Sequence, residues 1–195
     1  MPRPCFLESI VEHGNEMAKI IGTGPRLRVR CWSLSSSDIQ SSFKLWGNPE
    51  IIQFMLCEGV STLEETRDKL TVQQGCMRDH GTQQWAVELK ESRQVIGACG
   101  LSRMGESSSL DLSFCYIPES FGHGYATEAG ILVCRYGFSE LNQAVIAAGT
   151  LGDNKASQNV LHKIGFIQKG TKVWPDNQQE DPYFELVAAD LAAVP

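Results

Sequence analysis

The most informative part of the chain is the run Pro118-Glu119-Ser120-Phe121-Gly122-His123-Gly124-Tyr125-Ala126-Thr127-Glu128-Ala129. Residues 110–117 before it alternate polar and apolar side chains, as a half-buried strand does, and residues 128–138 have apolar side chains at helical spacing. A helix N-terminus preceded by glycines binds anions, because its first N–H groups have no partner within the helix and its dipole favours negative charge. The run therefore predicts a phosphate-binding loop between a strand and a helix.

This loop differs from two common nucleotide-binding motifs. It lacks the Gly-Lys-Ser/Thr ending of a Walker A motif, and only Gly122 and Gly124 are present of the three glycines in a dinucleotide fingerprint. The sequence therefore supports neither a kinase nor a dehydrogenase. Taken alone, the short Gly-x-Gly is also typical of a plain tight turn between a strand and a helix.

Strand and helix patterns occupy most of the remaining chain. Strands are predicted at residues 26–31, 84–89, 95–101, 110–117, 144–150, 166–173 and 183–187, and helices at residues 39–46, 64–77, 128–138 and 155–164. With 195 residues, of which 42% are hydrophobic, the chain is long enough for one domain and too short for two ordinary ones. We expect that domain at residues 26–195, with residues 1–25 as an N-terminal extension.

Composition opposes several classes of function. No apolar stretch approaches the roughly 20 residues needed to cross a bilayer, and the first residues lack the apolar core of a secretory signal, so a cytoplasmic protein with no membrane association is expected. The net charge of -6 opposes binding to nucleic acid. The seven cysteines are scattered without a Cys-x-x-Cys pair, so they are expected to be reduced thiols, and no metal site is predicted.

Two segments resemble a known family. Residues 118–129 resemble the acetyl-CoA pyrophosphate loop of the GNAT acetyltransferases, in which Gly124 and Ala126 match small positions and Phe121 stands where much of the family has Gln or Arg. Residues 153–166 resemble the Asn-x-x-Ser-x-x-Val/Leu-Leu-x-Lys-x-Gly-Phe segment of its ribosomal-protein alanine N-acetyltransferase branch. The resemblance covers about residues 26–187.

The resemblance implies an α/β (α+β) fold with a mixed, mostly antiparallel sheet of about seven strands and helices on both faces. The sheet is expected to be splayed open between the strand ending at Ile117 and the strand ending at Thr150, with coenzyme A in the gap. The pyrophosphate is expected to bind the backbone N–H groups of residues next to Gly122, namely His123, Gly124, Tyr125, Ala126 and Thr127.

The resemblance also implies contacts with the pantetheine arm of coenzyme A. The backbone of Cys115, Tyr116 and Ile117 is expected to pair with this arm and to place one N–H near the thioester carbonyl. Asn154 matches an asparagine that contacts pantetheine, although within Gly152-Asp153-Asn154 it is equally a turn residue.

Acetyl transfer to an amine also needs a group that removes the amine proton and a group that protonates the departing thiolate. Ser157 matches a serine that protonates the thiolate, and the alternative is a first-turn helix residue that bonds to the backbone. Asp111 matches a glutamate that deprotonates the amine through water, and the alternative is a solvent-facing strand residue. Glu88 is a second choice for this base, whereas Cys115 has no nearby His or Asp that would make it a covalent carrier.

These features predict an enzyme that transfers an acetyl group from acetyl-CoA to an amine by direct attack, without a covalent intermediate. A protein N-terminal α-amino group is the favoured acceptor, and a polyamine or an antibiotic is the alternative. A non-catalytic module that senses acyl-CoA is the alternative from another class. The resemblance implies that the acceptor side is built from the first helices and the loop at residues 174–181. Four large aromatic side chains either line this side or belong to the core: Trp46, Phe54, Trp85 and Trp174. Either a monomer or a homodimer fits the sequence.

Overall fold

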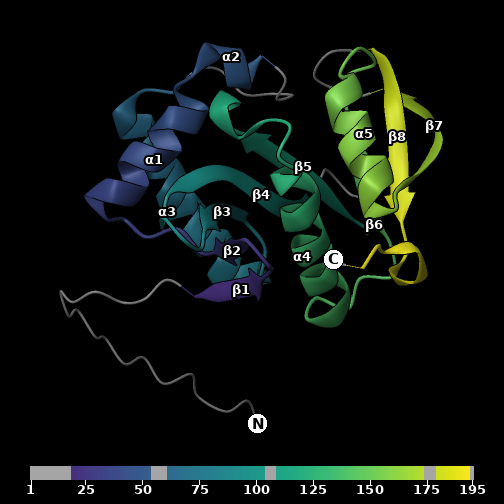
Figure 1. The fold of residues 1–195 in the computed structure, drawn as a ribbon, viewed down its shortest axis with the longest axis horizontal. Coiled ribbons are helices and arrows are strands. Elements are labelled where there is room, and N and C mark those ends of the chain that lie inside the picture. Colours follow the sequence, from purple (N-terminus) through teal and green to yellow (C-terminus); the bar gives the residue numbers. More distant parts are fainter. Residues whose placement is uncertain (1–18, 54–60, 104–108, 174–178, 194–195) are drawn as a thin grey trace, which may run out of the picture.

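Within residues 19–53, 61–103, 109–173 and 179–193, which the computed structural model describes, eight strands form one sheet (Figure 1). Their order across the sheet is β1-β2-β3-β4-β5-β6-β8-β7, and β5 and β6 are the one parallel pair among these neighbours. The strands are β1 (Ile20–Thr23), β2 (Leu27–Arg30), β3 (Gln84–Leu89), β4 (Val95–Arg103), β5 (Leu110–Tyr116), β6 (Ile146–Gly149), β7 (Ile167–Val173) and β8 (Glu180–Leu186). The predicted mixed, mostly antiparallel sheet is confirmed.

One strand lies inside the range predicted as an extension. β1 pairs with β2 in antiparallel register, with Ile20 opposite Arg30 and Thr23 opposite Arg28. The sheet therefore begins before residue 26. A four-residue edge strand has too few positions to show an alternating pattern, so no local signal predicts it. Residues 1–18 of the predicted extension lie outside the described residues.

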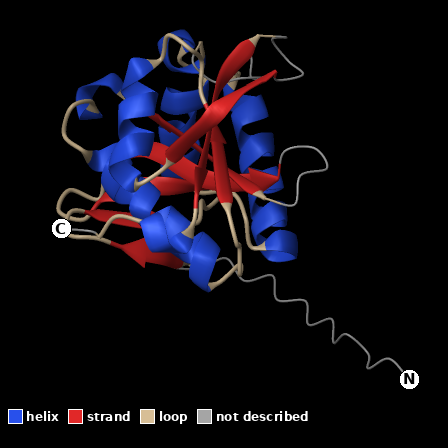
Figure 2. Ribbon diagram, turned by 90° about the vertical axis from the view of Figure 1, so that its right-hand side faces the viewer, coloured by secondary structure: helices blue, strands red, loops and turns tan. Residues whose placement is uncertain are grey.

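Helices cover both faces of the sheet, as predicted (Figure 2). They are α1 (Ser36–Trp46), α2 (Pro49–Ile52), α3 (Leu63–His80), α4 (Tyr125–Ser139) and α5 (Lys155–Ile164). Their ends follow from local capping: Ser35 caps α1, Thr62 and Glu65 form a capping box on α3, and Gly165 in the left-handed conformation ends α5. The short helix α2 was not predicted. In the described part of the chain no helix is both long and apolar enough to span a membrane.

Two apolar clusters fix the helices on the sheet. On one face, α4 and α5 pack against residues such as Leu101 of β4 and Phe184 of β8. On the other face, Trp46 of α1 packs against Ala98 of β4 and Cys115 of β5. Trp46 and Trp85 are only 2% and 0% exposed, so both belong to the core rather than to an acceptor pocket. Phe54 and Trp174 lie outside the described residues.

The sheet splits between β5 and β6. Their pairing consists of Leu110 with Ile146 and Asp111 with Ala147. Beyond these pairs β5 continues along β4 to Tyr116, and β6 continues along β8 to Gly149. The two strands therefore diverge toward their carboxyl ends, which confirms the predicted splay. One strand leads to α4 and the other to α5, and these helices are neighbours on the same face (Figure 1).

Candidate active site

The predicted phosphate loop connects the end of β5 to α4. Gly122 has a φ of 77°, and Gly124, which directly precedes α4, has a φ of 77° as well. Side chains rarely tolerate this backbone conformation, so glycine is required at both positions. Gly124 has no side chain to cap α4, so the first N–H groups of the helix, carried by residues 125–127, remain available for an anion. Phe121 is 62% exposed at the start of this loop.

Two residues that sequence reasoning missed hold this loop against the sheet. Glu128, in the first turn of α4, is 5% exposed and accepts hydrogen bonds from the backbone N–H groups of Arg26 and Leu27 at 2.9 and 3.1 Å. The Arg26 Nε donates to the same carboxylate at 2.8 Å, and its Nη1 donates to the backbone oxygen of His123 at 2.8 Å. These residues lie about a hundred positions apart in the chain, so no local pattern pairs them.

The end of β5 presents backbone groups to the split. The N–H of Ile117 donates to the backbone oxygen of Ile96 on β4 at 3.0 Å. Because backbone groups of successive residues in a strand point to opposite sides, Cys115 also faces β4, whereas the N–H and C=O of Tyr116 face the split. Of the three residues predicted to pair with pantetheine, Tyr116 therefore has its backbone groups directed at the gap.

Asn154 and Ser157 lie at the start of α5, on the other side of the split. Asn154 is the N-cap of this helix, and its side-chain oxygen accepts from the Ser157 N–H at 3.0 Å. The oxygen of the Asn154 side-chain amide therefore caps the helix, and the NH2 group of the same amide can donate a hydrogen bond to a ligand. Ser157 is half-buried in the first turn of α5.

Asp111 lies where β5 and β6 begin to diverge and is only 9% exposed. Burial raises the pKa of its carboxyl group to about 6, although Lys172 acts in the opposite direction. In the sheet Asp111 is paired with Ala147, and Ala147 is paired with Glu185, so the three side chains point to the same face. The predicted alternative of a solvent-facing strand residue does not fit this burial.

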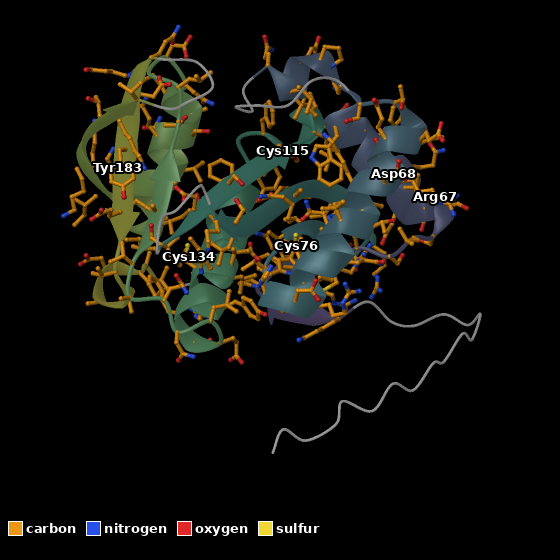
Figure 3. All side chains as sticks on the ribbon, turned by 180° about the vertical axis from the view of Figure 1, so that it is seen from behind. Arg67, Asp68, Cys76, Cys115, Cys134 and Tyr183 are labelled. Atoms are coloured by element: carbon orange, nitrogen blue, oxygen red, sulfur yellow. The ribbon has the colours of Figure 1, made fainter. Side chains whose placement is uncertain are left out.

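Tyr183 of β8, labelled in Figure 3, is a further polar residue at this site that the sequence pattern did not single out, and the charge of Asp111 acts on it. Its hydroxyl donates to Glu185 Oε1 at 3.0 Å. Burial, the bond to Glu185 and the nearby charge of Asp111 raise the pKa of Tyr183 to about 12. The alternation along β8 could have identified Tyr183. Phe184 and Leu186 pack in the core with α5, so Tyr183 and Glu185 between them must point to the opposite face of the sheet.

Glu88, the second choice for the base, is enclosed by arginines. It is 3% exposed, and its carboxylate lies 2.8 Å from Arg30 Nε, 2.9 Å from Arg93 Nε and 3.7 Å from Arg28 Nη1. The Glu88 carboxylate is thus engaged in ion pairs with three arginines. Among the residues that the structure describes, no group of three or more His, Cys, Asp and Glu side chains is arranged to hold a metal ion.

Comparison with known proteins gives a consistent family. Residues 26–167 match the family model described as an acetyltransferase (GNAT) domain. YoaA of Bacillus subtilis (strain 168), named an uncharacterized N-acetyltransferase, is 24% identical over 151 residues, which cover 77% of this chain and 85% of YoaA. Because the family model spans most of the chain, the family is established by sequence.

Solved structures with this fold agree with that match. A GNAT-family acetyltransferase from Bacillus anthracis has a TM-score of 0.73 at 22% identity and covers 87% of this chain and 98% of its own. RimL, a ribosomal L7/L12 α-N-protein acetyltransferase, has a TM-score of 0.74 at 13% identity and covers 92% and 99%. At these identities the superpositions report the fold alone. The family model and the fold together show that this chain belongs to the GNAT family of acetyltransferases.

Proposed function

We propose that this protein transfers the acetyl group of acetyl-CoA directly to an amine, with a protein N-terminal α-amino group as the favoured acceptor. The observation that carries the proposal is the split between β5 and β6. Because these strands are parallel, the loop after β5, with Gly122 to Thr127, and the turn after β6, with Asn154, lie at the same edge of the sheet. Ligands bind at such a point, outside the carboxyl ends of strands whose connections diverge.

In this proposal the pyrophosphate, the pantetheine arm and the thioester of acetyl-CoA each have a partner in the protein. The N–H groups at the start of α4 bind the pyrophosphate, and the backbone of Tyr116 pairs with the pantetheine arm. The NH2 group of Asn154 donates to the same arm from the other side of the split. A backbone N–H at the end of β5 stabilises the negative charge that develops on the thioester oxygen.

The chemistry follows from the two candidate proton carriers. The Asp111 carboxylate takes a proton from the ammonium group of the acceptor through a water molecule, and its raised pKa makes it a stronger base than an exposed aspartate. The neutral amine forms a bond to the thioester carbon. The tetrahedral intermediate then collapses with cleavage of the carbon–sulfur bond. The Ser157 hydroxyl gives its proton to the leaving thiolate, and the second proton of the attacking nitrogen passes through water to the Ser157 oxygen, which leaves a neutral amide, the CoA thiol and a restored hydroxyl.

The choice of a protein acceptor rests on sequence. Residues 153–166 follow the pattern of the ribosomal-protein N-acetyltransferases, and RimL, which acts on a protein α-amino group by its name, shares the fold. The experiment combines two measurements on the full chain. Calorimetry measures binding of acetyl-CoA, and thiol release is followed with peptides that carry a free α-amino group, with the same peptides blocked at that amine, and with polyamines and aminoglycosides.

Each outcome decides one part of the proposal. Thiol release with free but not blocked peptides, with the acetyl group located at the N-terminus by mass spectrometry, supports the favoured acceptor. Release with polyamines or aminoglycosides alone contradicts it and leaves the acetyl transfer intact. Binding of acetyl-CoA with no release from any amine supports the non-catalytic module, and a failure to bind overturns the whole proposal.

A further inference from the structure

We propose that Arg26 is a positioning residue for the phosphate loop, which orients the loop for its anion and neutralises the buried carboxylate of Glu128 beside it. The inference rests on the proposed binding of acetyl-CoA. The Arg26 side chain contacts a backbone oxygen of the loop and the carboxylate of Glu128. The proposed role requires no contact between Arg26 and the ligand. Two independent observations support it.

The first observation is the bond from Arg26 Nη1 to the backbone oxygen of His123 at 2.8 Å. In a planar trans peptide the C=O and the following N–H point in opposite directions. When Arg26 binds the oxygen of His123, the N–H of Gly124 must therefore point away from Arg26. Gly122 and Gly124 both have a positive φ, so the glycine-rich backbone has other conformations within reach. The bond from Arg26 to the His123 carbonyl favours one of these loop conformations.

The second observation is the position of Glu128. This carboxylate is 5% exposed in the first turn of α4, at the helix end that is to receive a pyrophosphate. A negative charge there is favoured by the helix dipole, but it also repels a bound anion. The Arg26 Nε lies 2.8 Å from Glu128 Oε2 and supplies the opposite charge. Without Arg26, the phosphates would bind next to an uncompensated carboxylate.

The arrangement holds the guanidinium from several sides. The Arg26 guanidinium carbon lies 4.7 Å from the centre of the Tyr125 ring, and the His123 ring stacks on the same tyrosine at 5.5 Å. The backbone N–H groups of Arg26 and Leu27 also donate to Glu128 Oε1. β2 and the first turn of α4 are thus joined by a network in which Arg26 carries the positive charge.

The test measures binding of CoA by calorimetry to the wild type, Arg26→Gln and Arg26→Gln/Glu128→Gln. The glutamine at position 128 retains an oxygen for the backbone N–H groups and removes the charge. Arg28→Gln is the matched control, because Arg28 lies two residues further along, on β2, and pairs with Glu88 at 3.7 Å instead of with the loop. Circular dichroism and thermal unfolding establish that each variant is folded at the temperature of the titration.

We expect Arg26→Gln to raise the Kd for CoA by about tenfold or more, because it removes a charge-assisted contact to the loop and exposes the phosphates to Glu128. The double variant should recover about threefold of this loss, because the repulsion is gone although the carbonyl contact is still missing. Arg28→Gln should bind CoA as the wild type does. A purely structural role of Arg26 would give no recovery in the double variant, because Glu128→Gln removes a further interaction.

The proposal is overturned when Arg26→Gln binds CoA within twofold of the wild type, or when the double variant binds no more tightly than Arg26→Gln. Should Arg26→Gln not fold, Arg26→Lys takes its place. Lysine keeps the charge beside Glu128 but lacks the fork that also reaches the His123 oxygen, so its Kd is expected to rise, and an unchanged Kd contradicts the orienting role. A wild type that does not bind CoA at all instead refutes the proposed function.

Discussion

The side-chain oxygen of Asn154 accepts a hydrogen bond from the backbone N–H of Ser157 at 3.0 Å. This bond makes Asn154 the N-cap of α5 and places both residues at the edge of the split between β5 and β6. The sequence left open whether Asn154 is a turn residue or a contact for pantetheine. The structure makes the two roles compatible, because they use different ends of the amide.

The two roles of Asn154 are separable by substitution. Asn154→Ser keeps an oxygen that caps the helix but removes the NH2 donor, so we expect near-native stability and weaker binding of acetyl-CoA. Asn154→Ala should in addition lower the free energy of unfolding by about 1 kcal/mol. Urea denaturation and calorimetry measure the two effects. Native affinity in Asn154→Ser would show that the residue acts only as a cap.

The glycine at position 122 is expected to be essential for the shape of the loop. Gly122→Ala puts a side chain at a φ of 77°, which costs about 1–2 kcal/mol, and should weaken acetyl-CoA binding because the loop relaxes to another conformation. Gly81→Ala is the control, since Gly81 has a φ of 71° at the end of α3 and lies outside the loop. Both variants should lose stability, and only Gly122→Ala should lose affinity. Equal affinities of the two would contradict a specific role of the loop.

Asp111 should give the pH profile of the reaction a limb near its own pKa. Since a base works when ionised and burial raises the pKa of Asp111 to about 6, kcat/KM should rise as the pH passes through about 6. Asp111→Asn should lose this limb and about a hundredfold in kcat. Ser102→Ala, which changes the residue opposite Asp111 on β4, should retain the limb. A limb that persists in Asp111→Asn belongs to another group.

The same raised pKa predicts that ionisation of Asp111 lowers the stability of the fold, although it raises the activity. The folded protein holds the Asp111 proton up to a higher pH than the unfolded chain does, so ionisation of Asp111 destabilises the fold as the pH rises from about 4 to about 6. Above this range Asp111→Asn should be more stable than the wild type, and the difference should vanish at low pH. Thermal unfolding at pH 4 and pH 8 measures it.

Ser157→Ala should reduce kcat while leaving the KM for acetyl-CoA nearly unchanged. The hydroxyl is proposed to act only on the departing thiolate, and the Ser157 N–H that binds Asn154 is retained in the alanine variant. Loss of a general acid typically costs about a hundredfold or more in rate. Steady-state kinetics on the acceptor found in the panel tests this. A full kcat in Ser157→Ala would assign the protonation step to water.

Glu88 is expected to matter for stability rather than for chemistry. Its buried carboxylate lies beside Arg28, Arg30 and Arg93, so Glu88→Gln removes one of the two carboxylate partners of Arg30, which keeps its bond to Asp38, and should cost about 1–3 kcal/mol of unfolding free energy. The activity of the protein that remains folded should be close to that of the wild type. A loss of kcat in folded Glu88→Gln would restore Glu88 as a candidate base.

Local sequence was sufficient for most of the secondary structure. The helical spacing of residues 155–164 predicted α5 with the bounds that the structure has, and the other predicted helices lie within observed ones. Capping at Ser35, Thr62 and Gly165 depends on residues within one turn, so the ends of helices are also a local property. The strand, the loop with Gly122 and Gly124 and the following helix were likewise readable, since a positive φ is a local demand on the residue type. β1 was not, because a short edge strand is defined by its partner.

The sequence by itself determined the class of fold, the phosphate loop and the family motifs, because each of these depends on residues that are close together in the chain. Only the tertiary structure joined Arg26 to Glu128, buried Asp111 at the divergence of two strands and surrounded Glu88 with arginines. The physical reason is that burial and charge pairing depend on side chains brought together from distant parts of the chain. The protonation and reactivity of a side chain follow from those neighbours, whereas its propensity for helix, strand or turn is largely its own.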